Sequence, residues 1–214
     1  MAKRTVAEGR RRAAGPPDAK SVEREGVELI RCEARLRRPR VEAGDGAKSE
    51  ARGDSWSFLR LPAAASGRLR SRGMVSIRGE LNGAGFAGTL QPDGEGGHWL
   101  RVEKKVREAA EVEVGEVVRL EFSPVLVEPE PEVPADLRKA LAAAPAKARD
   151  VWKDITPAAR RDFVHWIVSP KKAETRVKRI ETACDMLAKG KRRPCCFDRS
   201  GKFDGSLRCP VAEE

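Results

Sequence analysis

The feature that most constrains the fold of this chain is a change in hydrophobic spacing across a proline-rich segment. Residues 128–134 read Glu-Pro-Glu-Pro-Glu-Val-Pro, and prolines spaced in this way hold a chain extended and semi-rigid. Before this segment, apolar residues alternate with polar ones, which is typical of half-buried strands. After it they recur every three or four residues, which is typical of amphipathic helices. The sequence therefore predicts a β part, a linker at 128–134 and an α part.

Alternating apolar and polar residues predict five or six short strands in the first part. The clearest case runs from Val27 to Leu36, where Ile30, Cys32 and Ala34 share one face and charged side chains occupy the other. Several short strands with one short helix favour a small, antiparallel-rich β-barrel at residues 25–127, closed or nearly closed. The other strands are expected at Trp56–Leu61, Met74–Asn82, Trp99–Val102 and Val117–Phe122, and the helix at Glu103–Ala110.

A glycine-rich stretch in this part has the letters of a nucleotide-binding motif. Residues 83–88 match G-x-G-x-x-G, which binds dinucleotides when it opens a helix. Here it leads into Thr89-Leu90-Gln91-Pro92, which is typical of a strand end and a turn. We therefore interpret these glycines as hairpin residues that allow tight strand packing, and we expect no cofactor.

Helical spacing predicts three to four short helices at residues 135–190. Short helices with tight connections form a small bundle, so the predicted fold class is α+β, with a β-barrel followed by a C-terminal helical bundle. The helices are expected at Ala135–Ala144, at Ala146–Asp154, from Thr156-Pro157 onward, and in a longer segment that ends at Gly190.

The functional interpretation depends on the last of these helices. Ser169 can cap it, Pro170 fits its first position, and Gly190 can end it in a left-handed conformation. One apolar stripe along the helix should be buried. This stripe is predicted to consist of Ala173, Val177, Ile180, Cys184 and Leu187.

Lys172, Arg176 and Arg179 form a predicted cationic ridge on the same helix, because positions i, i+4 and i+7 share a face. No acidic residue follows this line, so we expect the three cations to have no carboxylate partner. One interpretation is a solvated face with cations placed to suit the helix dipole, and the other is an anion-binding surface. The predicted surface comprises Lys172, Arg176, Arg179, Lys189, Lys191, Arg192 and Arg193.

The two ends of the chain are predicted to lie outside both domains. Residues 1–24 contain Arg10-Arg11-Arg12 and almost no large apolar side chain, a composition typical of a disordered basic tail. Residues 191–214 form a second basic tail with Cys195, Cys196 and Cys209. These cysteines lack the C-x-x-C spacing of zinc sites, so we expect no metal site and interpret them as packed, inert thiols.

The sequence also bears on the cellular compartment. No stretch approaches the roughly 18 apolar residues of a transmembrane segment, and no apolar run follows the basic N-terminus as it would in a secretory signal. Five cysteines without a disulfide-rich spacing fit a reducing compartment. We expect a cytoplasmic protein.

Two groups of residues carry a resemblance to a known family. The run Lys171-Lys172-Ala173-Glu174-Thr175-Arg176, then Arg179-Ile180 and Gly190-Lys191-Arg192-Arg193-Pro194-Cys195-Cys196-Phe197, resembles the signature of the bacterial YdeI/OmpD-associated family, also described as bacteriocin-protection proteins. The resemblance implies a two-part architecture, a link to envelope stress and cationic peptides, and no known catalytic residues.

The middle of the chain resembles the small β-barrel domain of unknown function that is often fused to this family. The resemblance runs from Phe58-Leu59 through residues 78–83 to Gly94, His98, Arg107 and Val118. It implies a possible ligand site in the barrel at His98 and Arg107. The family often has Gly-Asp where this chain has Gly115-Glu116, which puts any role of that aspartate in doubt.

These features favour a non-enzymatic binding and stress-tolerance module. A formal net charge of +10 favours anionic partners, so the expected partner is an unknown protein or a small anionic ligand. Nonspecific nucleic-acid binding is the first alternative. An uncharacterised enzyme is the second, although the chain has only two histidines and no tyrosine and shows no catalytic constellation.

Overall fold

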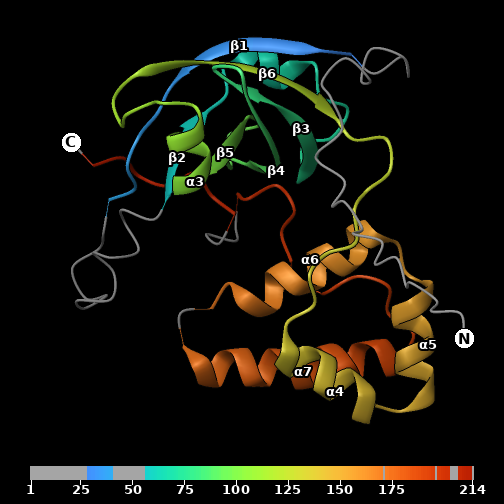
Figure 1. Ribbon diagram of the computed structural model, residues 1–214. Coiled ribbons are helices and arrows are strands. Elements are labelled where there is room, and N and C mark those ends of the chain that lie inside the picture. Colours follow the sequence, from blue (N-terminus) through green and yellow to red (C-terminus); the bar gives the residue numbers. More distant parts are fainter. Residues whose placement is uncertain (1–27, 41–55, 171, 196, 203–206, 214) are drawn as a thin grey trace, which may run out of the picture.

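The computed structural model describes residues 28–40, 56–170, 172–195, 197–202 and 207–213. The predicted disordered tail at 1–24 and the predicted polar loop at 44–54 lie outside these residues, as does Cys196. The described chain forms a curled antiparallel sheet followed by a group of helices, so the predicted α+β class is confirmed (Figure 1).

The sheet of the described part has six strands in the order β1-β6-β3-β4-β5-β2, and all neighbours are antiparallel. Its edges meet where Arg37 and Phe58 exchange two backbone hydrogen bonds of 2.8 Å. The sheet is therefore curled and almost closed, as the short alternating segments predict. The strands are β1 Ile30–Arg35, β2 Trp56–Arg60, β3 Val75–Leu81, β4 Ala84–Pro92, β5 His98–Glu103 and β6 Val117–Pro124.

Apolar side chains fill the inside of this sheet. In β1 the burial alternates as predicted, with Ile30 and Ala34 buried and Arg31, Glu33 and Arg35 exposed. Leu59, Leu90 and Leu120 have no exposed surface. The interior is thus a packed core, while the short helices α2 (Ala63–Gly67) and α3 (Lys104–Ala109) connect strands at its rim.

The glycine-rich stretch is a hairpin, as predicted. Asn82 and Gly83 have φ angles of 46° and 89°, and they connect β3 to β4, where Leu81 pairs with Ala84. Two successive positive φ angles are typical of a type I′ turn, and an Asn-Gly pair suits that turn. The stretch continues as a strand, so it cannot present a helix N-terminus to a pyrophosphate.

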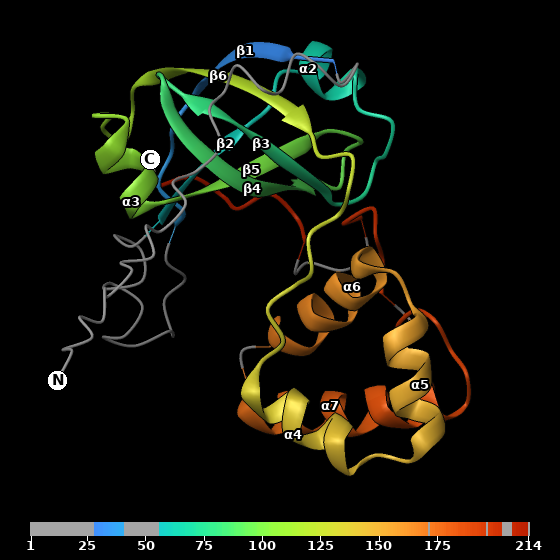
Figure 2. The ribbon, with the colours of Figure 1, turned by 45° about the vertical axis from the view of Figure 1, so that its right-hand side comes forward.

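Four helices follow in the described part, which confirms the predicted bundle: α4 Ala135–Ala143, α5 Ala146–Asp154, α6 Pro157–Val168 and α7 Ala173–Ala188 (Figure 2). α6 begins as predicted, because the Thr156 hydroxyl accepts a 3.2 Å hydrogen bond from the Ala159 N–H. A second core joins the four helices, with Leu137, Phe163, Ile167 and Leu187 fully buried.

The start of α7 differs from the prediction. Its N-cap is Lys172, and Ser169 belongs to the last turn of α6, where its hydroxyl donates to the Trp166 carbonyl at 3.2 Å. The serine satisfies a free carbonyl at the end of one helix instead of a free N–H at the start of the next. The predicted cap at Ser169 is therefore wrong.

The other end of α7 agrees with the prediction. Gly190 has φ +79°, and the N–H of Lys191 donates to the Met186 carbonyl at 2.9 Å, which closes the helix in a Schellman-like arrangement. The predicted apolar stripe is partly confirmed. Ile180 and Leu187 are buried, but Val177 is 55% exposed because the N-terminal turns of α7 extend beyond the bundle core.

Candidate functional site

Of the three residues of the predicted cationic ridge, Arg176 and Arg179 lie on α7 and Lys172 is its N-cap, and the three differ in their contacts. Arg176 forms a two-point ion pair with Asp136 of α4, with distances of 2.7 and 2.9 Å. This pair raises the pKa of Arg176 and lowers that of Asp136. The expectation that Arg176 has no carboxylate partner is therefore wrong, because the partner comes from a different helix.

Arg179 is also committed to the fold, although not to a carboxylate. Its guanidinium donates to the Trp166 carbonyl and, at 2.9 Å, to the Ser169 hydroxyl. It also lies over the Trp166 ring, with 5.1 Å from its central carbon to the ring centroid. Arg179 thus stabilises the connection between α6 and α7. Lys172 is exposed, and its side chain has no hydrogen bond or ion pair within the described residues.

The cations beyond the end of α7 are mostly paired. Lys189 contacts Asp185 at 2.7 Å, Arg192 pairs with Asp154, and Arg193 pairs with Asp162. Lys191 is exposed and, in the described part of the chain, forms no side-chain hydrogen bond or ion pair. Lys147 of α5 lies beside this helix end, since its Cε would be 3.9 Å from a Cβ at Gly190.

His98, a predicted ligand residue, is the first residue of β5 and has no exposed surface. Its Nδ1 lies 2.6 Å from the Ser66 hydroxyl and its Nε2 lies 3.1 Å from the Gly73 carbonyl. A carbonyl only accepts, so Nε2 carries the proton and Ser66 donates to Nδ1. Burial is the main reason that the pKa of His98 is lowered, which favours the neutral ring.

This arrangement does not resemble a nucleophilic triad. In a triad the histidine nitrogen opposite the serine is held by a carboxylate, whereas His98 faces the Gly73 carbonyl there. Ser66 is 1% exposed, so no substrate reaches it. The contacts position the segment between α2 and β3. Arg107, the other predicted ligand residue, is 8% exposed and lies in α3.

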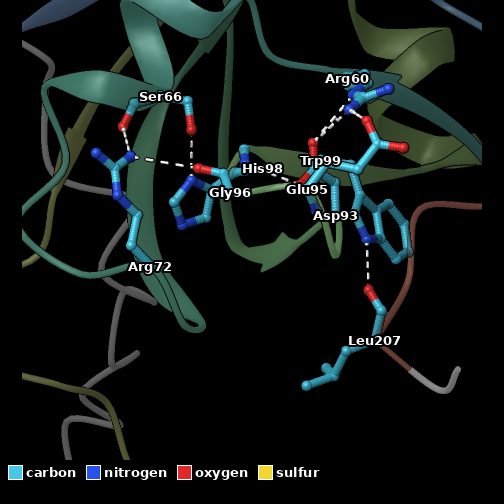
Figure 3. A network of polar contacts seen from close by, with 10 residues as sticks. Arg60, Ser66, Arg72, Asp93, Glu95, Gly96, His98, Trp99 and Leu207 are labelled. Atoms are coloured by element: carbon cyan, nitrogen blue, oxygen red, sulfur yellow. Dashed lines mark hydrogen bonds and ion pairs between the residues drawn. The ribbon is translucent and has the colours of Figure 1, made fainter. Parts of the chain in front are cut away.

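A tight turn next to His98 was not anticipated as a site (Figure 3). The Asp93 carboxylate accepts 2.8 Å hydrogen bonds from the N–H groups of Glu95 and Gly97, and it pairs with Arg60 at 2.8 Å. Burial alone would raise the pKa of Asp93, but these donors lower it. The sequence does contain a turn signal here, since Asp93-Gly94 is followed by two more glycines. This signal does not show that Arg60 pairs with the aspartate.

The sheet and the helices contact one another directly through α6. Arg161 donates to Glu128, to the Ser76 hydroxyl at 2.9 Å and to the Met74 carbonyl at 3.1 Å. The side chains of Arg161 and Glu128 are only 14% and 23% exposed. This cluster joins α6, the linker and β3 and its preceding loop.

A buried carboxylate lies beside this cluster. Asp162 is 1% exposed and pairs with Arg193 and, at 3.5 Å, with Arg199. Burial raises the pKa of Asp162 although the neighbouring arginines lower it. The two arginines come from the C-terminal segment, so Asp162 fixes this segment to α6.

The C-terminal segment then returns to the sheet, where its dark-red trace runs beside β2 in Figure 1. The Trp99 indole N–H donates to the Leu207 carbonyl at 2.8 Å. Beyond it, the N–H groups of Arg40 and Glu213 donate to Val211 and Arg38 at 2.8 and 2.9 Å. The sequence predicts only a tail at residues 191–214, because single contacts with distant residues leave no periodic pattern.

The described cysteines do not form disulfides. Burial raises the pKa values of Cys32, Cys184 and Cys209, the last to about 11. A high pKa keeps these thiols protonated and weakly nucleophilic at neutral pH. Among the described residues, no cluster of histidine, cysteine and acidic side chains has the arrangement of a metal site, and no helix is long and apolar enough to cross a membrane.

These elements define an α+β protein in which a curled antiparallel sheet is joined to a helical unit by a proline-rich linker and by the returning C-terminal segment. Residues 130–190 match the family described as bacteriocin-protection, YdeI or OmpD-associated, and residues 46–122 match a domain of unknown function, DUF1905. These two matches confirm the resemblance to the YdeI/OmpD-associated family with an N-terminal domain of unknown function. A comparison with curated proteins found no match.

Proposed function

We propose that this chain is a non-enzymatic binding module that recognises an anionic partner through exposed lysines at the two ends of α7. One observation carries the proposal. The arginines of the predicted surface are used within the fold, whereas the side chains of Lys172 and Lys191 are exposed and take part in no hydrogen bond or ion pair of the described residues. Lys147, next to Gly190, extends the surface at the Lys191 end.

The charge balance of the helical part supports this choice. Residues 135–190 contain thirteen lysines and arginines against seven aspartates and glutamates. The paired arginines keep their charge, so this region carries a positive potential that steers anions toward the exposed lysines. Lysine is a flexible point charge and suits such contacts without a preformed geometry.

The contacts of the candidate catalytic groups support a non-enzymatic role. Both ring nitrogens of His98 are used in contacts inside the fold, and its nearest hydroxyl, that of Ser66, is buried. The inside of the sheet is filled mainly by leucine, isoleucine and valine side chains, so a ligand has to bind at the surface.

The test replaces Lys147, Lys172 and Lys191 with glutamine and compares partner recovery in a pull-down from the host's own lysate. The control triple variant replaces Lys104, Lys105 and Lys202 with glutamine. These lysines lie outside the helical part, and their replacement removes the same amount of positive charge. We expect recovery to be lost only in the first variant, with both variants keeping the wild-type melting temperature. Equal recovery by both variants would exclude this lysine surface.

The family description links these proteins to bacteriocin protection. We infer a cytoplasmic, regulatory role in stress tolerance, because a chain with a net charge of +10 repels cationic peptides and is poorly suited to sequester them. A native mass spectrum of protein purified from its own host tests this inference by revealing a retained partner or ligand.

Nonspecific nucleic-acid binding is the second candidate, and the net charge of +10 favours it. Phosphate contacts release counterions, so the affinity for DNA should fall steeply as salt rises. Gel shifts at increasing salt separate the two functions. A shift that is absent at low salt, or insensitive to salt, excludes nucleic acid.

A further inference from the structure

The outer face of β2 and β5 carries two buried aromatic rings. Side chains alternate along strands, so Leu59 and Leu100 belong to the core inside the sheet, while Phe58 and Trp99 point to the opposite side. Phe58 and Trp99 are nevertheless only 2% and 4% exposed. Their rings meet edge to face with centroids 6.3 Å apart. These rings need a cover from outside the sheet.

Residues 207–213 supply part of this cover, at Trp99. Leu207 has no exposed surface, and its carbonyl accepts the Trp99 indole N–H at 2.8 Å (Figure 3). Further along, Ala212 forms an antiparallel bridge with Pro39, flanked by backbone hydrogen bonds of 2.8 and 2.9 Å. The segment thus lies against the sheet as an added strand does in peptide recognition.

Charged residues of the sheet also lie near the segment at 207–213. Its apolar anchor, Leu207, is followed six residues later by Glu213, which lies 3.8 Å from the Arg38 guanidinium. Burial and the carboxylates of Asp93 and Glu95, both paired with Arg60, raise the pKa of the Cys209 thiol, whereas Arg60 and Arg37 lie close enough to lower it. The segment therefore has an aliphatic side chain near the aromatic rings at one end and a carboxylate near arginines, here called the arginine rim, at the other end.

We propose that this surface, the tail face (Phe58, Trp99, Arg37, Arg38, Arg40 and Arg60), is a docking site for an extended segment of a partner protein that carries an aliphatic anchor and, about six residues later, a carboxylate. The chain's own residues 207–213 occupy the tail face and compete with the partner. Among the described residues, they are held by one buried leucine, one indole hydrogen bond, one short bridge, the Glu213–Arg38 pair and the partly buried Cys209. The partner binds to the fraction of molecules in which the face is free, so its apparent affinity is reduced by that fraction.

The experiment measures binding of a fluorescein-labelled peptide, Leu-Arg-Ser-Pro-Val-Ala-Glu-Glu, to the full-length chain by fluorescence anisotropy. The peptide copies residues 207–214 with serine in place of Cys209. The variant Glu213→Pro removes the N–H that donates to the Arg38 carbonyl, and residue 213 is exposed, so the sheet stays folded. We expect this variant to bind the peptide about tenfold more tightly than the wild type, because the loss of a hydrogen bond frees the face.

Two comparisons make the result decisive. A peptide with both glutamates replaced by lysine should bind at least about tenfold more weakly, because the arginine rim repels it. The variant Leu207→Asp, which removes the anchor of the chain's own segment, should bind the original peptide as Glu213→Pro does. Absence of binding to both variants, equal affinity for the wild type and the variants, or equal affinity for both peptides would each overturn the proposal.

Discussion

Arg176 and Asp136 form a two-point ion pair between α7 and α4, with N–O distances of 2.7 and 2.9 Å. The arginine stands in the middle of the predicted ridge, yet its charge is used to hold two helices together. The proposed recognition surface is therefore a set of lysines, and the arginines around it make contacts within the fold. This difference gives the first prediction.

Replacing Arg176 with glutamine should lower the free energy of unfolding by about 0.5 to 1 kcal/mol, because the pair has good geometry but is partly exposed. Urea unfolding measures the change. Lys172→Gln is the matched control on the same helix and should leave stability unchanged. A loss of equal size in both variants would show that the ion pair does not stabilise the bundle.

Gly79 of β3 is predicted to be the least replaceable glycine of the hairpin region. A Cβ at this position would lie 2.1 Å from the Glu121 carbonyl oxygen and 2.7 Å from the Phe122 Cα, so β3 and β6 would have to move apart. Gly79→Ala should destabilise the protein by about 3 kcal/mol or prevent folding. Thermal unfolding checks this.

Gly85 of β4 provides the control for that substitution. A Cβ there meets nothing within 4 Å, so Gly85→Ala should shift the melting temperature by no more than a degree or two. Comparable losses in the two variants would point to a general cost of removing glycine from the hairpin. The close approach of the strands at Gly79 would then not be the cause.

His98 should make stability fall as pH decreases below about 6.5, the ordinary pKa of histidine. Burial lowers the pKa of His98 in the folded protein, so below about pH 6.5 the unfolded chain binds more protons than the folded one and stability falls as pH falls. Melting temperatures of the wild type should therefore decrease from pH 7 to pH 5. His98→Gln should start lower, because the Ser66 and Gly73 contacts change, but should vary less over this range.

Asp93 separates this effect from general acid unfolding. The pKa of Asp93 is lowered in the folded protein, so its contribution is present above the ordinary aspartate pKa of about 4 and is lost only as pH falls through its folded pKa. Asp93 therefore contributes no loss of stability between pH 6.5 and 5. If wild type and His98→Gln lose stability in parallel over that interval, the buried histidine is not responsible.

Local signals predicted most of the fold. The alternation at Ile30, Cys32 and Ala34 and the cap at Thr156 each depend on residues within a few positions, and both agree with the structure. The prediction that Ser169 caps α7 is wrong because the end of α6 and the start of α7 compete for this serine. The sequence does not show that the Trp166 carbonyl and the Arg179 guanidinium lie next to its hydroxyl.

The contacts that define the candidate surfaces could not be predicted in the same way. Asp136 meets Arg176 forty positions away, and Trp99 meets Leu207 across 108 positions. Such pairs follow from how the elements pack and not from spacing along one helix or strand. The sequence identifies the lysines at the ends of α7 as candidates. It does not show that the arginines between them have partners within the fold while these lysine side chains have none.

Arg161 should hold the helical part against the sheet. Its guanidinium reaches Glu128, Ser76 and the Met74 carbonyl, and both members of the Arg161–Glu128 pair are mostly buried. Removing one partner leaves a buried carboxylate without its counter-charge, which typically costs several kcal/mol. In Arg161→Gln, we therefore expect faster proteolysis of linker residues 125–134, while amide exchange in β3 and β6 stays slow.

Arg138→Gln, which loses only a surface contact with the Val133 carbonyl, is the control at the other end of the linker. Proteolysis at the same rate in both variants would mean that the remaining contacts, including those of Asp162 with Arg193 and Arg199, fix the two parts without Arg161.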